Sequence, residues 1–585
     1  MQSSPMLGAN LQSGAVEFRV WAPKHDKLSV EINGSEVLDL QREAAGVFSG
    51  TAKAKAGDRY CYLVGDKRLP DPVSRYLPDG VHGPTEIVDP KAFRWEDQNW
   101  NGLPFKDYVI YELHVGTFTP EGTFDGVLHK LDYLRKLGVT AIEIMPVAAF
   151  PGNRNWGYDG VSMYAVQASY GGPEGLRRLV NAAHRVGLAV VLDVVYNHLG
   201  AEGNYLREFG PYFTDRYHTV WGDAINYDNE GCEQVRRYVV ENALHWVREY
   251  HIDGLRLDAI QAIHDSSRTN IVKELVRAVQ EFANVSGRRI CVMAESDQND
   301  RKLILPASEG GFGLDAVWSD DFHHSVHTLM TGENRGYYQD FGGPEKIVKA
   351  LNEGFVFQGQ HFRFWRASRG TSTEGIPLTR HIFCIQNHDQ VGNRCFGERL
   401  HQLVPRGAVK AAAALLLLAP ETPLLFMGEE YAESAPFQFF TDYGDKHLQQ
   451  AVVEGRRKEF EDFGWEDMPN PQDPATFDKS KLTWKFDDDV LAWYRELLQL
   501  RRKYVIPSGR KCHAQLREGE IVIELPRQDA GLVLRVRFPG IQTRQSEFDP
   551  ERKPLLRSDE DGYEVLVLEK QAAQEIVEAQ PRRIA

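Results

Sequence analysis

The segment Asp253-Gly254-Leu255-Arg256-Leu257-Asp258-Ala259 reads as a short apolar strand that ends in an arginine and a carboxylate. Residues two apart on a strand point to the same side, so the side chains of Arg256 and Asp258 are expected to share one face. A guanidinium beside a carboxylate favours the ionised acid, which is the form that an attacking carboxylate needs at neutral pH. Most such pairs are ordinary ion pairs, so a catalytic role needs support from the rest of the chain.

From Tyr108 onward, eight apolar runs of strand length alternate with stretches of helical pattern. Near-continuous apolar strands separated by helices indicate a parallel sheet covered on both faces. Eight such units favour a closed (β/α)8 TIM barrel over an open sheet, and in that fold the chemistry lies at the C-terminal ends of the strands. The runs are 109–115, 141–146, 189–195, 254–258, 290–295, 314–319, 382–387 and 423–428.

Three domains are predicted. Residues 1–95 show short alternating strands broken by turns, which is typical of a β-sandwich. Prolines mark an irregular linker after these strands, and residues 96–504 hold the predicted catalytic barrel with its insertions. The strand pattern returns after Tyr504, so residues 505–585 are predicted to form a second β-sandwich. The expected fold is therefore α/β, a TIM barrel flanked by an N-terminal and a C-terminal β-sandwich domain.

Length and charge restrict the classes of partner. The chain has 585 residues and a net charge of −15, whereas nucleic acids and anionic membranes are bound through clustered Lys and Arg. We therefore expect no nucleic acid and no membrane as a partner, and a neutral substrate fits the acidity. A monomer or a homodimer is expected.

The cysteines and the N-terminus bear on the cellular compartment. Six cysteines are scattered without CxxC spacing, a pattern that predicts reduced thiols in a cytoplasmic protein and neither disulfides nor a metal site. The first residues lack the basic and apolar regions of a signal peptide. No apolar run approaches the roughly 20 residues that span a bilayer. No cofactor is expected.

Acidic residues stand at or just beyond the ends of four predicted strands: Asp193, Asp258, Glu295 and Asp389. Accompanied by histidines and an arginine, but by no phosphate loop or metal-binding His cluster, they suit cleavage of a glycosidic bond. A retaining glycosidase needs one ionised carboxylate as nucleophile and one protonated acid, about 5 to 5.5 Å apart. Arg256 favours the ionised form of Asp258. The apolar run before Glu295 is expected to raise the pKa of that acid by desolvation, which suits a proton donor.

Two further sets of residues are candidates for sugar binding. His388 and Asp389 are expected to bind sugar hydroxyls and to stabilise an oxocarbenium-like transition state. The segment Asn155-Trp156-Gly157-Tyr158-Asp159-Gly160 follows the second strand and is expected to form a platform for the sugar ring. Tyr158 is favoured as the functional aromatic of this segment, while a packed loop position is an equal alternative for Trp156.

Four segments occur in order along the predicted barrel: 193–198 (DVVYNH), 254–259 (GLRLDA), 294–296 (AES) and 387–389 (NHD). Together they resemble the four motifs of the α-amylase family of glycoside hydrolases, and the resemblance covers nearly the whole chain. It implies Asp258 as nucleophile, Glu295 as general acid/base and Asp389 as transition-state stabiliser. Asp193 is implied as a structural support. The residues implied to hold the sugar at subsite −1 are Tyr158, His198, Arg256 and His388.

Further segments resemble one branch of this family, whose members release trehalose from maltooligosyltrehalose. These segments are 294–300 (AESDQND), 318–327 (WSDDFHHSVH), 388–394 (HDQVGNR), 428–431 (GEEY) and 436–440 (PFQFF). The implied reaction is hydrolysis of the α-1,4 bond next to the terminal trehalose unit. The residues implied to line the subsites around the cut are Asp320, Asp321, His323, His324, Gln390, Asn393 and Arg394.

Gln261 departs from the pattern of the family. Three residues after the nucleophile many α-amylases carry Lys, and the trehalose-releasing branch usually carries His. Gln can still donate to a sugar hydroxyl, so the departure concerns the +1 and +2 subsites and not the activity. Asn197 matches a calcium-site position in many amylases, but the remaining ligands are not visible and no metal is predicted.

Two alternative functions remain open. A glucan branching enzyme or an isoamylase-type debranching enzyme would share the domain layout and the three acids, although the Asp320-Asp321-Phe322-His323-His324 segment favours the trehalose-releasing branch. A non-catalytic glycan-binding barrel is an alternative of another class. Such proteins usually lack one or more of the acids, and this chain retains Asp258, Glu295 and Asp389.

Overall fold

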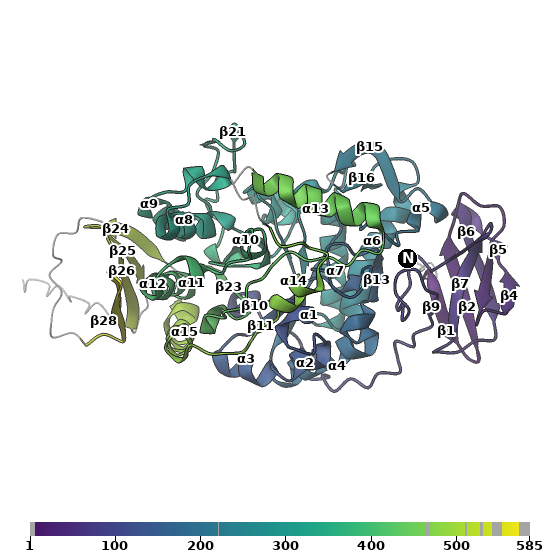
Figure 1. Ribbon diagram of the computed structural model, residues 1–585, viewed down its shortest axis with the longest axis horizontal. Helices are drawn as coiled ribbons and strands as arrows, with labels where there is room; N and C mark the ends of the chain where they lie inside the picture. The colour runs from purple at the N-terminus through teal and green to yellow at the C-terminus, as the bar shows by residue number, and fades with distance from the viewer. Residues whose placement is uncertain are drawn as a thin grey trace, which may run out of the picture.

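The computed structural model of the chain describes residues 6–219, 221–461, 468–508, 512–526, 530–540 and 553–571. Figure 1 shows three parts in a row, with the N-terminal sheets at one end, the barrel in the middle and the C-terminal sheet at the other end. The predicted α/β fold, a TIM barrel with flanking β domains, is confirmed. Among the described residues, no helix combines the length and the apolar character needed to cross a membrane.

Eight parallel strands close the central barrel. Each of the eight predicted runs overlaps one strand, and β23 pairs with β10 to complete the circle. The strands are buried on both faces, because helices cover the outside of the sheet and side chains fill its interior. In order around the barrel, the strands are β10 (Ile110–Leu113), β11 (Ala141–Ile144), β14 (Ala189–Val194), β17 (Gly254–Leu257), β18 (Cys291–Ala294), β19 (Ala316–Trp318), β22 (His381–Phe383) and β23 (Thr422–Phe426).

The helices follow from the apolar periodicity of the sequence. In α4 (Gly172–Arg185), Leu176, Leu179, Val180 and Ala183 recur at helical spacing and are fully buried, as expected for a stripe that faces a sheet. α12 (Arg406–Leu417) is buried at every residue after Arg406. Other helices are α2 (Phe124–Leu128), α3 (Leu131–Leu137), α6 (Cys232–Glu249), α7 (Ile271–Ser286), α8 (Asp320–Thr331), α9 (Pro344–Glu353), α10 (His388–Gly392) and α15 (Asp488–Leu500).

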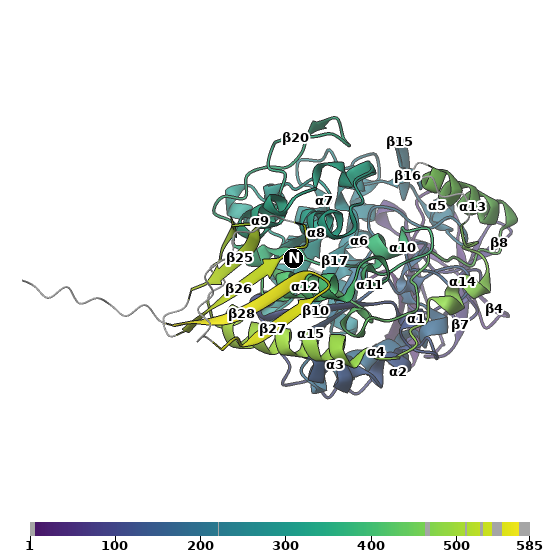
Figure 2. The same cartoon turned by 60° about the vertical axis from the view of Figure 1, so that its left-hand side comes forward.

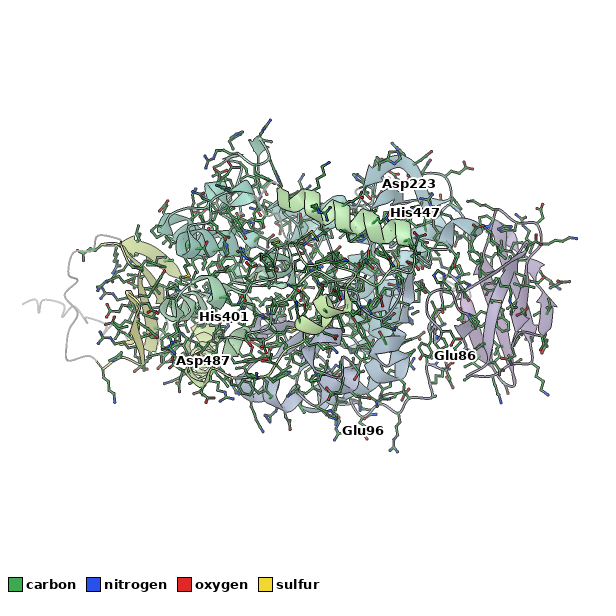
Figure 3. All side chains as sticks on the ribbon, viewed as in Figure 1. Glu86, Glu96, Asp223, His401, His447 and Asp487 are labelled. Carbon is green, nitrogen blue, oxygen red and sulfur yellow. The ribbon has the colours of Figure 1, made fainter. Side chains whose placement is uncertain are left out.

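The N-terminal domain consists of two antiparallel sheets whose inner residues, such as Phe18 and Tyr62, are fully buried. Arg75 forms an ion pair with Glu249 of α6 and links the linker to the barrel. Glu86 of β9, labelled in Figure 3, lies at the junction of the domain with the barrel. One sheet holds β1 (Gly8–Gln12), β2 (Ala15–Trp21), β5 (Gln41–Arg42) and β6 (Val47–Ala52), and the other β3 (Ser29–Ile32), β4 (Glu36–Asp39), β7 (Arg59–Val64), β8 (Lys67–Leu69) and β9 (Thr85–Glu86).

The C-terminal domain presents one antiparallel sheet of five strands beside α12 (Figure 2). Within the described residues its second layer is this helix and not another sheet. Arg406 and Lys410 of α12 form ion pairs with Glu560, which attach the sheet to the barrel. The strands are β24 (His513–Arg517), β25 (Glu520–Leu525), β26 (Ala530–Arg537), β27 (Leu556–Glu560) and β28 (Tyr563–Gln571).

Insertions after the barrel strands build walls around the C-terminal ends of the strands. One is a hairpin of β15 (Phe213–Thr219) and β16 (Gly222–Ile225), and another is the hairpin of β20 (His361–Phe362) and β21 (Ala367–Ser368). α13 (Lys446–Glu461) lies near the β15–β16 hairpin in both views (Figures 1 and 2). These insertions rise at the end of the barrel where a TIM barrel carries its active site.

Candidate active site

Arg256 in β17 lies at the centre of the candidate site and binds three carboxylates. Its side chain is fully buried, and its guanidinium lies over the ring of Trp318 at 4.3 Å. Nη1 lies 2.8 Å from Oδ1 of Asp258 and 2.7 Å from Oδ2 of Asp193, while Nη2 lies 2.9 Å from Oε2 of Glu295. One planar guanidinium therefore holds carboxylates from three neighbouring barrel strands, a geometry that a compact ammonium group does not provide.

Asp258 follows β17 and has a donor on each carboxylate oxygen. Arg256 binds Oδ1, and Nδ2 of Asn197 donates to Oδ2 at 2.7 Å. Donors of this kind stabilise the ionised carboxylate. The next residue, Ala259, adopts a left-handed conformation with φ 37° and ψ 53°, which is unfavourable for a residue with a Cβ atom. This turn directs the amide of Ala259 to Oε2 of Glu295 at 3.0 Å.

Glu295 follows β18, and its side chain is 15% exposed. Burial raises the pKa of Glu295 well above its usual range. Arg256 opposes this shift, whereas the neighbouring carboxylates of Asp258 and Asp389 add to it. The raised pKa favours the protonated form of Glu295, which is the state that a general acid needs.

α10 brings His388 and Asp389 to the mouth of the barrel. The side chain of Asn387 caps this helix by accepting from the amide of Gln390 at 3.0 Å. His388 is buried, whereas the side chain of Asp389 is 39% exposed, and Nε2 of His388 lies 3.4 Å from Oδ1 of Asp389. Burial opposes a charge on His388, but the carboxylates of Asp389 and Glu112 raise the pKa of His388 to about 9. The ring is therefore an imidazolium at neutral pH.

Tyr158 connects the His388 side of the site to the Arg256 side. Its hydroxyl donates to Oδ2 of Asp193 at 2.6 Å and lies 2.8 Å from Nε2 of His388. Burial raises the pKa of Asp193 to about 6, and Arg256 opposes this shift. Asp193 is only 2% exposed, so it lies behind Arg256 and Tyr158. Trp156 is also buried and stacks on Phe437 with ring centroids 5.2 Å apart, as expected for a packed loop aromatic.

His198 lies on the other side of Tyr158. Its Nε2 lies 2.9 Å from the carbonyl oxygen of Tyr158, and its Nδ1 contacts Oδ1 of Asn197. The imidazole stacks on the indole of Trp221, with centroids 4.0 Å apart and an interplanar angle of 7°. Trp221 lies between β15 and β16 and is 46% exposed. The hairpin therefore offers a partly exposed aromatic face beside His198.

Asp320 and Gln390 lie on the Asp389 side of the site. Nε2 of Gln390 lies 3.2 Å from Oδ1 of Asp320, at the first residue of α8. Burial raises the pKa of Asp320 to about 6, and the charge of Asp389 adds to the shift. The structure therefore places these two predicted residues next to the predicted transition-state stabiliser.

Asp321 is directed into the protein. It is fully buried, and its Oδ2 accepts from the amides of Val356 and Phe357 and from Nδ2 of Asn299. Its Oδ1 lies 2.9 Å from Nη1 of Arg369. The side chain thus ties α8 to the segments that precede and follow the β20–β21 hairpin and offers no exposed surface to a sugar.

His323 and His324 are buried on α8 as well. Their Nδ1 atoms lie 3.0 Å apart, and His324 stacks on Tyr337 with centroids 5.0 Å apart. Burial lowers the pKa of both imidazoles well below the usual range, so both are neutral at neutral pH. Their exposures of 2% and 8% leave little surface for direct contact with substrate.

Asn393 and Arg394 continue α10. The exposed Asn393 accepts a hydrogen bond from Arg456 of α13 at 2.8 Å. Arg394 forms a bidentate ion pair with Glu333 at 2.8 and 3.1 Å. A cavity of about 240 Å³ opens beside them, and its lining includes Tyr337, Tyr338, Gln390, Asn393 and Arg394.

Gln261 lies in a 3-10 helix, Ile260–Ala262, just beyond the nucleophile position. Its Oε1 is buried and has no hydrogen-bond partner within the described part of the chain, so it is an acceptor suited to a hydroxyl group.

The structure also bears on metal binding. Across the residues that the structure describes, no three His, Cys, Asp or Glu side chains are grouped to hold a metal ion.

Comparisons with known proteins identify the family. A family model described as the alpha amylase catalytic domain matches residues 87–222. The malto-oligosyltrehalose trehalohydrolase of Saccharolobus solfataricus is 47% identical over 511 residues, which cover 87% of this chain and 89% of that protein. The chain belongs to the malto-oligosyltrehalose trehalohydrolase family. The trehalohydrolase of Deinococcus radiodurans is 45% identical and is covered to 84%, with 86% of this chain matched.

A solved structure supports the same placement. The crystal structure of a putative alpha amylase from Salmonella typhimurium is 39% identical, with a TM-score of 0.88 and coverage of 97% of this chain and 99% of that one. The predicted resemblance and enzyme class are confirmed: this trehalohydrolase family member is a glycosidase of the alpha-amylase family. A glucan branching enzyme of Pseudoalteromonas atlantica is only 26% identical over 73% of this chain. The alternative of a branching enzyme is therefore supported less well than membership of the trehalohydrolase family.

Sequence reasoning missed two residues of the site. Glu112 accepts from the backbone amide of His388 at 3.0 Å and contacts Nδ1 of that imidazole. An acid inside an apolar strand run was the available signal, because a buried charge needs a partner. Trp221 had no such signal, since its contact with His198 depends on the path of the β15–β16 hairpin.

Proposed function

We propose that this chain hydrolyses the α-1,4-glucosidic bond next to the terminal trehalose unit of maltooligosyltrehalose, with retention of configuration, releasing trehalose and a shortened maltooligosaccharide. The observation that carries the proposal is the binding of Asp258 and Glu295 to separate nitrogens of the buried Arg256. Two carboxyl groups held side by side, one favoured as an anion and one as an acid, are the groups that a retaining glycosidase needs.

Asp258 acts as the nucleophile in this proposal. Its carboxylate, stabilised by Arg256 and Asn197, attacks the anomeric carbon of the glucose unit at subsite −1 and forms a covalent glycosyl-enzyme. Glu295 gives its proton to the glycosidic oxygen, so the trehalose unit leaves as a neutral alcohol. The resulting Glu295 carboxylate then takes a proton from a water molecule that attacks the same carbon, which frees the maltooligosaccharide and restores both acids.

Asp389 is assigned the stabilisation of the transition state. Its 39% exposed side chain lies at the mouth of the site, where a carboxylate can favour the positive charge that develops on the sugar ring. Tyr158, His198, Arg256 and His388 are assigned to subsite −1. Arg256 binds both reacting acids, and Tyr158 contacts His388 and His198, which supports this assignment.

Gln390, Asn393 and Arg394 are assigned to the neighbouring subsites, which the cavity that they line supports. Asp320 is assigned there as well, because it lies 3.2 Å from Nε2 of Gln390. For Asp321, His323 and His324 we propose an indirect role. Their burial and internal contacts suit residues that hold α8 in place, so their effect on substrate would act through Asp320.

The net charge and the cysteines of the chain bear on its substrate class, its partners and its cellular compartment. A neutral oligosaccharide suits the chain's net charge of −15, and we propose no nucleic acid or membrane partner. The six scattered cysteines, four of them buried, suit the reducing cytoplasm. A monomer or a homodimer is proposed, and no cofactor enters the reaction.

Product analysis tests the proposed function. The purified protein is incubated with maltotriosyltrehalose, and the products are separated by anion-exchange chromatography. We expect trehalose and maltotriose to appear in equal amounts, with a branched glucan cleaved far more slowly. Equal or faster action on the branched glucan would contradict the assignment and favour a debranching or branching enzyme.

A further inference from the structure

Glu112 and Glu143 occupy paired positions on the neighbouring parallel strands β10 and β11. Both are only 1% exposed, and cross-strand neighbours in a sheet lie about 5 Å apart. Two buried carboxylates at this separation cannot both be ionised without a strong penalty. One of the two acids is therefore expected to be ionised and the other to be protonated.

The two acids differ in their partners. Neither side-chain oxygen of Glu143 has a hydrogen-bond partner within the described part of the chain, and burial raises the pKa of Glu143 well above its usual range, with the charge of Glu112 adding to the shift. Glu112 instead binds His388 twice, through the backbone amide at 3.0 Å and through Nδ1 at 2.5 Å. Glu143 is therefore the neutral acid, and Glu112 is the one with a cationic partner.

We propose that Glu112 is a positioning residue of the reaction, which holds His388 as a hydrogen-bond donor at both ring nitrogens and so fixes the direction of a chain of hydrogen bonds that ends on Arg256. The inference deepens the proposed function and rests on it. Glu112 itself touches neither the substrate nor the reacting acids, so its effect is exerted through His388.

The chain of hydrogen bonds has one consistent direction. The Tyr158 hydroxyl has a single proton, which it gives to Asp193 at 2.6 Å, the shorter of its contacts. It must therefore accept at 2.8 Å from Nε2 of His388. Nε2 can donate while Nδ1 donates to Glu112 only if the ring is an imidazolium. Oδ2 of Asp193 also accepts a hydrogen bond from Nη1 of Arg256 at 2.7 Å, and the chain of hydrogen bonds ends there.

Charged and titratable groups from several barrel strands surround His388. A pKa of about 9 for His388 is consistent with the geometry: burial opposes the charge, and the carboxylates of Asp389 and Glu112 outweigh it. Arg256 opposes the charge as well. The groups that face or act on this imidazole are Glu112 of β10, His114 beyond β10, Glu143 of β11, Tyr158, Asp193 of β14, Arg256 of β17 and Asp389 of α10.

The consequence concerns the atoms that meet the sugar. The Nε2 proton of His388 is held between the Tyr158 hydroxyl and Oδ1 of Asp389, which lies 3.4 Å away. A neutral His388 would give Tyr158 a second possible acceptor and would leave Asp389 without this cation. Loss of the Glu112 charge should therefore disturb the transition state more than the binding of substrate.

The test compares Glu112→Gln with Glu143→Gln. Both are isosteric changes of buried acids at the same level of the barrel, but only the first removes a charge in our assignment. We expect Glu112→Gln to lower kcat on the order of 10- to 100-fold with KM changed less than about threefold, as for other residues that orient a functional imidazole. Its activity should also fall at a lower alkaline pH than in the wild type. Glu143→Gln should keep the wild-type kcat and pH profile.

A second readout follows His388 directly. In ¹⁵N-histidine spectra, the signal that is absent from His388→Gln identifies His388. Wild type and Glu143→Gln should keep this ring doubly protonated at pH 8, and Glu112→Gln should lower its titration midpoint by about one to three pH units. Glu112→Asp keeps the charge but shortens the side chain by one methylene, so the titration midpoint of His388 should fall by a smaller amount. If Glu112→Gln does not fold, the His388 midpoint in Glu112→Asp tests the proposal instead.

Two results would overturn the proposal. One is a neutral His388 in the wild type at pH 8, and the other is an unchanged titration of His388 in the Glu112 variants. Failure of the proposed function looks different, because the wild type would then release no trehalose from maltotriosyltrehalose while the His388 titration still reported on Glu112.

Discussion

Nη1 of Arg256 lies 2.8 Å from Oδ1 of Asp258, and the side chains of the two residues are 0% and 11% exposed. The same guanidinium also binds Asp193 and Glu295. One cation cannot neutralise three buried carboxylates, and the least costly solution is for one of them to keep a proton. The pKa of Glu295, raised by burial, identifies that acid. The charge balance of the site and the need for a general acid therefore lead to the same protonation state.

Replacing Arg256 by lysine tests this charge balance. An ammonium group cannot bind Asp193, Asp258 and Glu295 in one plane, so Arg256→Lys should lower kcat on the order of 100-fold or more and reduce the melting temperature. Steady-state kinetics and thermal unfolding measure both effects. Arg177→Lys is the matched control, because Arg177 is also a buried arginine, 2% exposed and packed over Tyr250. It should lower stability while leaving kcat unchanged, and an equal loss of kcat there would point to a general folding defect.

The roles of the two reacting acids can be separated with a substrate whose leaving group needs no proton. Glu295→Gln should lose hydrolysis of maltotriosyltrehalose by a factor on the order of 1,000 but should still release fluoride from α-maltosyl fluoride. Asp258→Asn should lose both reactions, because no covalent bond to the sugar can form. Fluoride release and trehalose release are measured side by side. Fluoride release that Glu295→Gln loses to the same extent as Asp258→Asn would contradict the separate roles.

The sequence predicted the barrel and its acids for physical reasons. Apolar runs of strand length mark strands buried on both faces, and the positions of Asp258 and Glu295 at the ends of two such runs predict that they lie at one end of the barrel. Arg256 and Asp258 are two residues apart on a strand and were predicted to share one face. The structure confirms this, with Nη1 and Oδ1 2.8 Å apart. Asp389 lies just beyond its apolar run, and its expected role as transition-state stabiliser was also implied by the family motif.

Other parts of the site could not be read from local patterns. Glu112 and His388 are separated by 276 residues, and no spacing rule connects two groups so far apart. The internal bonds of Asp321 depend on backbone amides of a distant loop, whereas the sequence showed only an acid within a polar segment. Such contacts arise from how the insertions fold back on the barrel, which propensity and periodicity do not specify.

The exposed indole of Trp221 should contribute to substrate binding. Its stack on His198, with centroids 4.0 Å apart, holds the ring at the edge of the site. Trp221→Ala should raise KM about two- to tenfold with little change in kcat, the range expected for one aromatic stacking contact. Trp95→Ala is the matched control, because Trp95 stacks on His251 at 3.8 Å in the same manner but takes no part in the site described above. A rise in KM of equal size in both variants would contradict a direct contact of Trp221 with the sugar.

The acids after β23 predict how stability depends on pH. Glu429 and Glu430 are buried in the 3-10 helix Glu429–Tyr431, and burial raises the pKa of Glu429 to about 8 and that of Glu430 to about 7. An unfolded Glu titrates near 4.3, so between these values the folded state binds more protons than the unfolded state. The free energy of unfolding should therefore fall as the pH rises from 5 to 8, by a few kcal/mol.

Urea denaturation at pH 5 and pH 8 measures this fall. Glu429→Gln should make it smaller, because the amide carries no titrating proton. Part of the fall should remain, since burial also raises the pKa of Asp71 and that of Asp193 to about 6. Glu249→Gln is the control: burial opposes the charge of Glu249, but His245 and Arg75 lower its pKa, so it titrates below this window. It should lower stability at both pH values and leave the difference between them unchanged. An equal or larger fall in Glu429→Gln would show that Glu429 is ionised in the folded protein.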